Sequence, residues 1–288
     1  MNKKSKGIMP LVVRTPEQAL ANPSLLFSDM AKDLWQSREL ARRLFIRDLK
    51  GLYRMSFLGY FWIFLPPLAT TLAFTFLNSR SLIKFEGIPI PYPAYLILGT
   101  LLWQNFADAL QAPLRMATQN RSMLIRVQFP REALILSGIY QVLFNFMIRL
   151  VLLIPVLIFY KIEFVRTAFL FPLGVIALIL MGTAFGLLLT PLGILYKDVE
   201  AGTTVILGFC MLLTPVVYPP MQEGLGFALT KWNPVTPVLQ TARDWLLGSP
   251  TSHLSGFYCV TGCMVIALLL GWILYRLALP HVIARIGN

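Results

Sequence analysis

One stretch of the chain decides its fold class: residues 167–196 read TAFLFPLGVIALILMGTAFGLLLTPLGILY, without a single charged side chain. About 20 consecutive apolar residues suffice for a helix to cross the hydrocarbon core of a membrane. The rest of the 288-residue chain has the same character, because 57% of it is apolar and only 13% is charged. Soluble domains average about 45–50% apolar and about 25% charged residues. The composition therefore indicates an integral membrane protein and excludes a disordered one.

Six segments have the length and apolarity expected of transmembrane helices. They cover residues 57–79, 93–112, 133–159, 167–196, 201–218 and 254–275. Only two charges interrupt them, Asp108 and Arg149. We therefore expect an all-α integral membrane protein whose six-span domain covers residues 57–280. An even number of spans places both termini on the same side of the membrane.

Positive charges define the expected orientation. If both termini are cytoplasmic, the cytoplasmic segments contain 18 of the 25 Lys and Arg residues and the outer loops contain six. Lys and Arg accumulate in cytoplasmic loops, so the sequence predicts an N-in, C-in topology. The same asymmetry explains most of the net charge of +12 without nucleic acid as a partner.

Three further regions are expected outside the spans. Residues 29–56 place apolar side chains at a spacing near 3.6 between basic ones, which predicts an amphipathic interface helix on the cytoplasmic leaflet. Residues 1–28 are expected to form a loosely ordered cytoplasmic arm. Residues 219–250 are too apolar for a free loop and too rich in Pro and Gly for a span. They fit an outer re-entrant helical region that is buried against protein.

The interface helix has a basic run that ends beside an aromatic residue. Its candidate contact residues are Arg42, Arg43, Arg47, Lys50, Tyr53 and Arg54. Attraction to anionic lipids is one explanation. Contact with a lipid pyrophosphate, or docking to a partner protein, is the other. The sequence leaves these possibilities open.

A second set of residues could face a transported substrate. They are Arg149, Tyr60, Phe64, Trp103, Phe106 and Tyr218. A charge inside a span costs about 3 kcal/mol or more, so we expect Arg149 to pair with Asp108 or to face an anionic or hydroxylated substrate. The rings belong to interface belts and core packing, or they stack on the C–H faces of sugars.

Gly182 and Gly186 form a Gly-x-x-x-Gly motif in the fourth expected span. Such a motif lets two helices approach closely, either within one subunit or across a dimer.

Sequence motifs of enzymes are missing from the chain. There is no Gly-x-x-x-x-Gly-Lys-Ser/Thr loop for ATP, no Gly-x-Ser-x-Gly and no His-Glu-x-x-His. Three cysteines and two histidines are too few for a disulfide framework or a zinc ribbon. We therefore expect a transport subunit that binds no metal or cofactor of its own.

Several short motifs together resemble a known family. They are Arg47-Asp48-Leu49-Lys50 with Tyr53, Leu58-Gly59-Tyr60-x-Trp62, Asn120-x-x-x-Leu124-Ile125-Arg126-x-x-Phe129-Pro130, Tyr196-Lys197-Asp198-Val199, and Thr214-Pro215-x-x-Tyr218-Pro219. In this order and spacing they resemble the permease subunits of ABC transporters that export O-antigen, capsule or wall teichoic acid.

The resemblance implies a homodimer in the bacterial cytoplasmic (inner) membrane, assembled with two copies of a separate ATPase subunit that binds ATP and Mg²⁺. It also implies a lipid-linked polysaccharide as the substrate, exported from the cytoplasmic side. Alternative functions are a six-span ABC exporter for lipids or drugs, a secondary transporter, and a membrane enzyme that transfers glycans.

The ATPase would have to act through a cytoplasmic surface, and two are large enough for that role: the amphipathic helix 29–54 and the loop 113–132. Met123, Leu124 and Val127 offer apolar anchors at helical spacing, and Arg126 offers charge. Phe129 and Pro130 complete the motif that resembles the family. A solvated loop with positive-inside charge is the simpler alternative.

Overall fold

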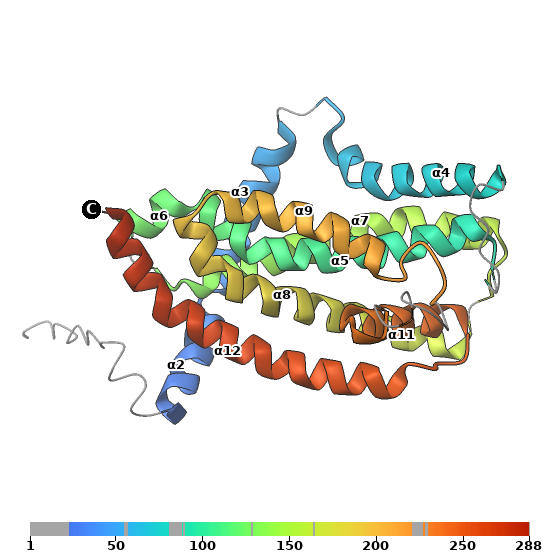
Figure 1. Cartoon of the computed structure of the whole chain (residues 1–288). Coiled ribbons are helices and arrows are strands. Elements are labelled where there is room, and N and C mark those ends of the chain that lie inside the picture. The colour runs from blue at the N-terminus through green and yellow to red at the C-terminus, as the bar shows by residue number, and fades with distance from the viewer. Residues whose placement is uncertain are drawn as a thin grey trace, which may run out of the picture.

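The chain forms an elongated bundle of helices, shown as a computed structural model in Figure 1. The structure describes residues 23–54, 57–80, 88, 90–127, 129–163, 165–220, 227 and 230–287. No β-strand occurs within these ranges, which confirms the all-α fold. The arm 1–22 and much of the segment 221–229 lie outside the described residues.

The helices divide into those that run along the bundle and those that lie at its ends. Their bounds are α2 (Pro23–Gln36), α3 (Arg38–Arg54), η1 (Gly59–Ile63), α4 (Leu65–Ser79), α5 (Tyr92–Gln119), α6 (Arg121–Arg126), α7 (Glu132–Phe159), η2 (Arg166–Leu170), α8 (Phe171–Leu195), α9 (Asp198–Leu213), α11 (Val235–Leu247) and α12 (Leu254–Gly287). Helices α4, α5, α7, α8, α9 and α12 follow the long axis (Figure 1). Helix α6 lies at the end where the chain terminates, here called the α6 end, and α11 lies at the opposite, α11 end.

Helix α8 is the centre of the bundle, since it packs against both α5 and α12. Glycines allow its close approach to α5. A Cβ atom on Gly182 would lie 2.6 Å from the carbonyl oxygen of Phe106, and one on Gly186 would collide with the carbonyl oxygen of Leu110. The Gly-x-x-x-Gly motif therefore packs within the subunit, which is one of its two expected roles.

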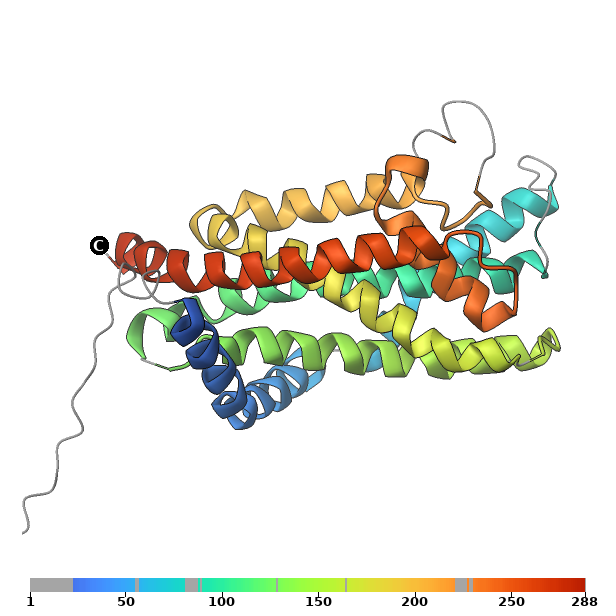
Figure 2. The same cartoon turned by 90° about the horizontal axis from the view of Figure 1, so that it is seen from below.

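The expected interface helix is divided into α2 and α3 by a turn at Ser37, whose hydroxyl donates to the Asp33 carbonyl over 2.6 Å. Both helices cross the bundle direction near the α6 end (Figure 2). Helix α3 packs on α7 and buries Ala41 and Leu44. The Arg47 guanidinium donates to the Asn120 side chain over 2.6 Å, which ties α3 to the turn between α5 and α6.

Among the described residues, three helices are long and apolar enough to cross a membrane, judged by length and composition: Glu132–Phe159, Arg166–Leu195 and Leu254–Arg285. Helices α4 and α9 have 15 and 16 residues, so at about 1.5 Å per residue they reach about 22 and about 24 Å, against about 30 Å of hydrocarbon. Helix α5 has 28 residues, but Gln104, Asn105 and Asp108 lower its apolarity. The six-span count and the orientation therefore stay predictions.

At the α11 end, α11 packs against α8, η2 and α12. The buried guanidinium of Arg243 joins α11 to the turn after α9, because its Nη2 donates to the Val216 carbonyl over 2.8 Å and its Nη1 to the Pro215 carbonyl over 3.2 Å. Arg243 also lies over the Tyr95 ring, 3.9 Å from its centroid. This part of the expected re-entrant region is thus buried against protein.

The topology can be tested with single cysteines in a variant that lacks Cys210, Cys259 and Cys263. Ser122 on α6 and Ser252 before α12 are both exposed and lie at opposite ends of the bundle. We expect Ser252→Cys to react with an impermeant maleimide in intact cells. Ser122→Cys should react only after the membrane is permeabilised, and labelling of Ser122→Cys in intact cells would contradict the N-in, C-in orientation.

Candidate functional site

A cleft of about 540 Å³ opens at the α6 end, between α6, the segment after it, α2 and α12. Five of the six expected coupling residues line it: Leu124, Arg126, Val127, Phe129 and Pro130. The sixth, Met123, packs half-buried against the neighbouring apolar core. Folding thus brings the motif of the 113–132 loop together on one concave surface.

The anchors in this cleft differ in what they can contact. Leu124 is only 7% exposed, because it belongs to the chain's own apolar core with Ala133, Leu187 and Tyr275. Ile125 and Val127 are 41% and 52% exposed. A partner inserted into the cleft would therefore meet Ile125 and Val127, whereas a change at Leu124 would disturb the chain's own packing.

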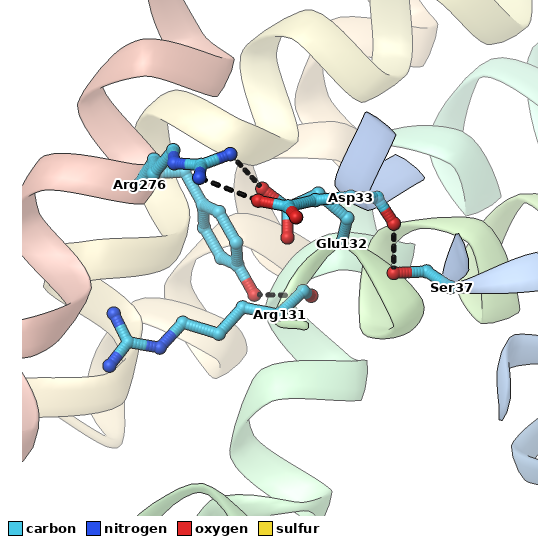
Figure 3. Close-up of polar contacts among 6 residues, drawn as sticks. Asp33, Ser37, Arg131, Glu132 and Arg276 are labelled. Atoms are coloured by element: carbon cyan, nitrogen blue, oxygen red, sulfur yellow. Dashed lines mark hydrogen bonds and ion pairs between the residues drawn. The ribbon is translucent and has the colours of Figure 1, made fainter. Parts of the chain in front are cut away.

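A branched ion pair joins three of the residues that line the cleft (Figure 3). One Nη atom of Arg276 lies 2.6 Å from the Asp33 carboxylate, and the other lies 3.0 Å from that of Glu132. The Tyr275 hydroxyl donates to the Arg131 carbonyl over 3.4 Å. The last turns of α12 are thereby tied to α2 and to the start of α7.

Only some of the charged residues that line the cleft have an ion-pair partner. Glu132 is only 4% exposed, and it shares the guanidinium of Arg276 with Asp33. The Arg131 guanidinium extends away from both carboxylates (Figure 3), and neither it nor Arg126 forms an ion pair within the described ranges. Burial lowers the pKa of Arg131 from its ordinary value, but a guanidinium stays charged in proteins. The cleft therefore offers two cations and several apolar groups to a partner.

The Asp33–Arg276–Glu132 cluster was not foreseen from the sequence. Asp33 and Arg276 belong to none of the sequence motifs quoted above. The two residues are separated by 243 positions. A single sequence has no local signal that would join them.

The cationic candidates of the interface helix lie on α3, away from this cleft. Arg43 pairs with Glu39, and Arg47 pairs with Asp48. Lys50 is exposed, and Arg42 lines a separate groove between α3 and α7. The side chains of Tyr53 and Arg54 lie outside the described part of the chain.

The expected substrate-facing rings do not meet at one place. Trp103 and Phe106, with ring centroids 5.3 Å apart, line an apolar cavity of about 1000 Å³ between α5, α8 and α9. The ring of Tyr60 packs at 5.9 Å from that of Phe144 on α7. Phe64 stacks edge-on against its neighbour Phe61. Tyr218 lies after α9, where its hydroxyl donates to the Leu212 carbonyl over 3.0 Å.

Arg149 pairs with a carboxylate, which is one of the two alternatives that the sequence predicted. Its Nη2 lies 2.8 Å from the Asp108 carboxylate, which also accepts a hydrogen bond of 3.2 Å from the Asn145 amide. The Arg149 Nε and Nη1 atoms have no hydrogen-bond partner among the described residues. The pair joins α5 to α7 inside the bundle.

Comparison with known proteins gives a consistent result. Residues 39–247, from α3 to the end of α11, match the family model described as ABC-2 type transporter. The chain is 28% identical over 190 residues to the O-antigen export system permease protein RfbA of Myxococcus xanthus, with 66% of this chain and 72% of that protein covered. A protein of the same name from Klebsiella pneumoniae is 24% identical over 214 residues, covering 72% and 80% of the two chains.

The Arg149–Asp108 pair can be tested by a double-mutant cycle. Arg149→Leu should destabilise the bundle by about 3 kcal/mol, because it leaves a largely buried carboxylate without its cation. Adding Asp108→Leu should recover most of that loss, since apolar residues can replace a buried pair. Thermal unfolding of the four purified proteins in detergent measures the coupling. If the stability losses of the two single variants add up to the loss of the double variant, the pair contributes nothing to stability.

The Arg276 cluster generates a second stability prediction. Arg276→Ala should cost about 1–3 kcal/mol, because Glu132 stays buried without its donor. In a Glu132→Gln background the same change should cost less. Arg285→Ala is the matched control on the same helix, since Arg285 is exposed and lines no part of the cleft. Equal effects of Arg276→Ala and Arg285→Ala on the melting temperature would contradict this role.

Proposed function

Because this chain belongs to the ABC-2 type transporter family, we propose that it is the membrane-spanning permease subunit of an ATP-driven exporter of a lipid-linked cell-surface polysaccharide. The names of the relatives support the substrate class, since the proteins from both organisms are O-antigen export permeases. The predominance of apolar helices supports a membrane location, which we propose is the bacterial cytoplasmic membrane.

One observation favours this function most: five of the six expected coupling residues line a single cleft at one end of the bundle. The sequence has no ATP-binding loop, so energy for transport has to arrive from another subunit. The cleft is suited to that task because its walls belong to α2, α6, α7 and α12, and the Arg276 cluster joins three of them. A force on the cleft would therefore reach helices that run the length of the bundle.

The proposed assembly is a homodimer with two copies of a nucleotide-binding ATPase subunit. Exposed apolar side chains on α4 and α9, including Leu72, Phe76, Ile206 and Phe209, are compatible with a second copy or lipid against these helices. Trp103 and Phe106 line the cavity between α5, α8 and α9, and under this proposal a sugar chain in the cavity would stack on their rings. ATP and Mg²⁺ would be held by the partner ATPase.

ATPase docking can be tested with Val127→Asp. Val127 is exposed in the cleft, so a carboxylate there should leave the permease folded and inserted but replace an apolar anchor of the contact with a charged, hydrated group. We expect ATPase co-purification to fall at least tenfold and surface polysaccharide to fall with it. Val165→Asp is the matched control, because Val165 is 42% exposed and precedes η2 at the opposite end of the bundle.

The outcomes separate the parts of the proposal. If Val127→Asp retains the ATPase and exports at the parental level, the cleft is not the coupling surface. If deletion of the permease gene leaves surface polysaccharide unchanged while the export of lipids or drugs falls, the proposed substrate class is wrong.

A further inference from the structure

A second hollow near the α6 end combines cations with aromatic rings. This groove, between α3 and α7, has a volume of about 590 Å³ and is lined by Arg38, Glu39, Arg42, Phe45, Tyr140 and Phe144. Helix α3 provides the charged wall, and α7 provides most of the aromatic one. It is separate from the cleft described above, with which it shares no lining residue.

The charged wall has an excess of positive charge. The carboxylate of Glu39 forms an ion pair with Arg43, and Arg43 does not line the groove. Arg42 is exposed and makes no hydrogen bond or ion pair with any described residue. Arg38 is held in place, because its guanidinium stacks 3.1 Å from the Trp35 ring centroid and its Nε donates to the Trp35 carbonyl over 3.3 Å. Arg38 and Arg42 therefore line the hollow, and neither forms an ion pair with a described residue.

The aromatic wall is a connected set of rings. Phe45 lies edge-on to Tyr140 and to Phe144, with centroid distances of 6.2 and 5.8 Å. Phe144 in turn contacts Tyr60, at 5.9 Å. This contact network joins α3, η1 and α7 and holds the rings of the groove in defined positions. Tyr60, expected from the sequence to face substrate, borders this set, whereas Trp103 and Phe106 lie elsewhere.

The two walls suit one kind of ligand. A guanidinium pairs with phosphate through two parallel hydrogen bonds, which a lysine cannot reproduce. An aromatic ring presents a flat apolar face, against which the C–H face of a sugar ring can stack. A sugar joined to a phosphate would engage both walls together. A phospholipid headgroup that lacks a sugar would engage only the arginines.

We infer that the α3–α7 groove binds the sugar-phosphate headgroup of the lipid-linked glycan, with Arg42 and Arg38 on the phosphate and Tyr140 and Phe144 against the first sugar. The inference rests on the proposed function. It assigns recognition of the headgroup to the cytoplasmic-leaflet end of the bundle and leaves the cavity at Trp103 for later stages of passage.

The test uses the full permease–ATPase complex in nanodiscs of phosphatidylcholine. The probe is a fluorescent polyprenyl pyrophosphate carrying one hexose, and the competitors are the same lipid without sugar and phosphatidylglycerol. Arg42→Ala should raise the Kd about tenfold, as expected for loss of a charged hydrogen-bonded contact. Arg42→Lys should recover only part of the affinity. Lys32→Ala is the control, because Lys32 is an exposed cation on α2 that does not line the groove.

The sugar wall is tested in the same assay. The parental complex should prefer the sugar-bearing lipid over the sugar-free one, and Tyr140→Leu should reduce that preference with the melting temperature as a check on folding. If Arg42→Ala binds like Lys32→Ala, or if phosphatidylglycerol competes as well as the glycan lipid, the inference is overturned while the proposed function stands. If the parental complex binds no glycan lipid and exports none, both are overturned.

Discussion

The bundle depends on the contact between α5 and α8, where glycines replace side chains. Lipid tails are as apolar as leucine, so helices inside a membrane gain little from hiding apolar surface and associate mainly through close van der Waals contact. Gly182 and Gly186 allow that contact by letting α8 touch the α5 backbone at Phe106 and Leu110. Because α8 also packs against α12 and α11, this seam determines where the other helices, and both ends of the bundle, can lie.

Inside this frame the arginines fall into two groups. Arg149, Arg243 and Arg276 have partners within the chain, namely Asp108, the carbonyl groups of residues 215 and 216, and two carboxylates, respectively. Since an unpaired buried charge is costly, these residues stabilise contacts between helices. Arg42, Arg126 and Arg131 have no such ion pairs within the described structure. These three cations at the α6 end are therefore available to a partner or a ligand.

The two candidate sites at that end are connected through the turn between α2 and α3. Asp33 on α2 reaches the Arg276 cluster in the cleft, and Arg38 at the start of α3 lines the groove on α7. Ser37 between them holds the turn through its hydrogen bond to the Asp33 carbonyl. If the ATPase docks in the cleft as proposed, a movement of α2 would also move Arg38 in the groove, so the two proposed sites are joined through a single turn.

The sequence by itself determined the all-α membrane fold, the amphipathic character of the interface helix and the loop that provides the cleft. These properties depend on composition, on charge and on a 3.6-residue period, which are all local. It also left two alternatives for the role of Arg149, an ion pair or contact with a substrate, because Asp108 was the only other charge in the expected spans. Only the tertiary structure decided that Leu124 faces inward, that Arg276 joins Asp33 and Glu132, and that Tyr60 belongs with Phe144 instead of Trp103. Each of these depends on which helix faces pack together, and residues up to 243 positions apart share no pattern that a single sequence could display.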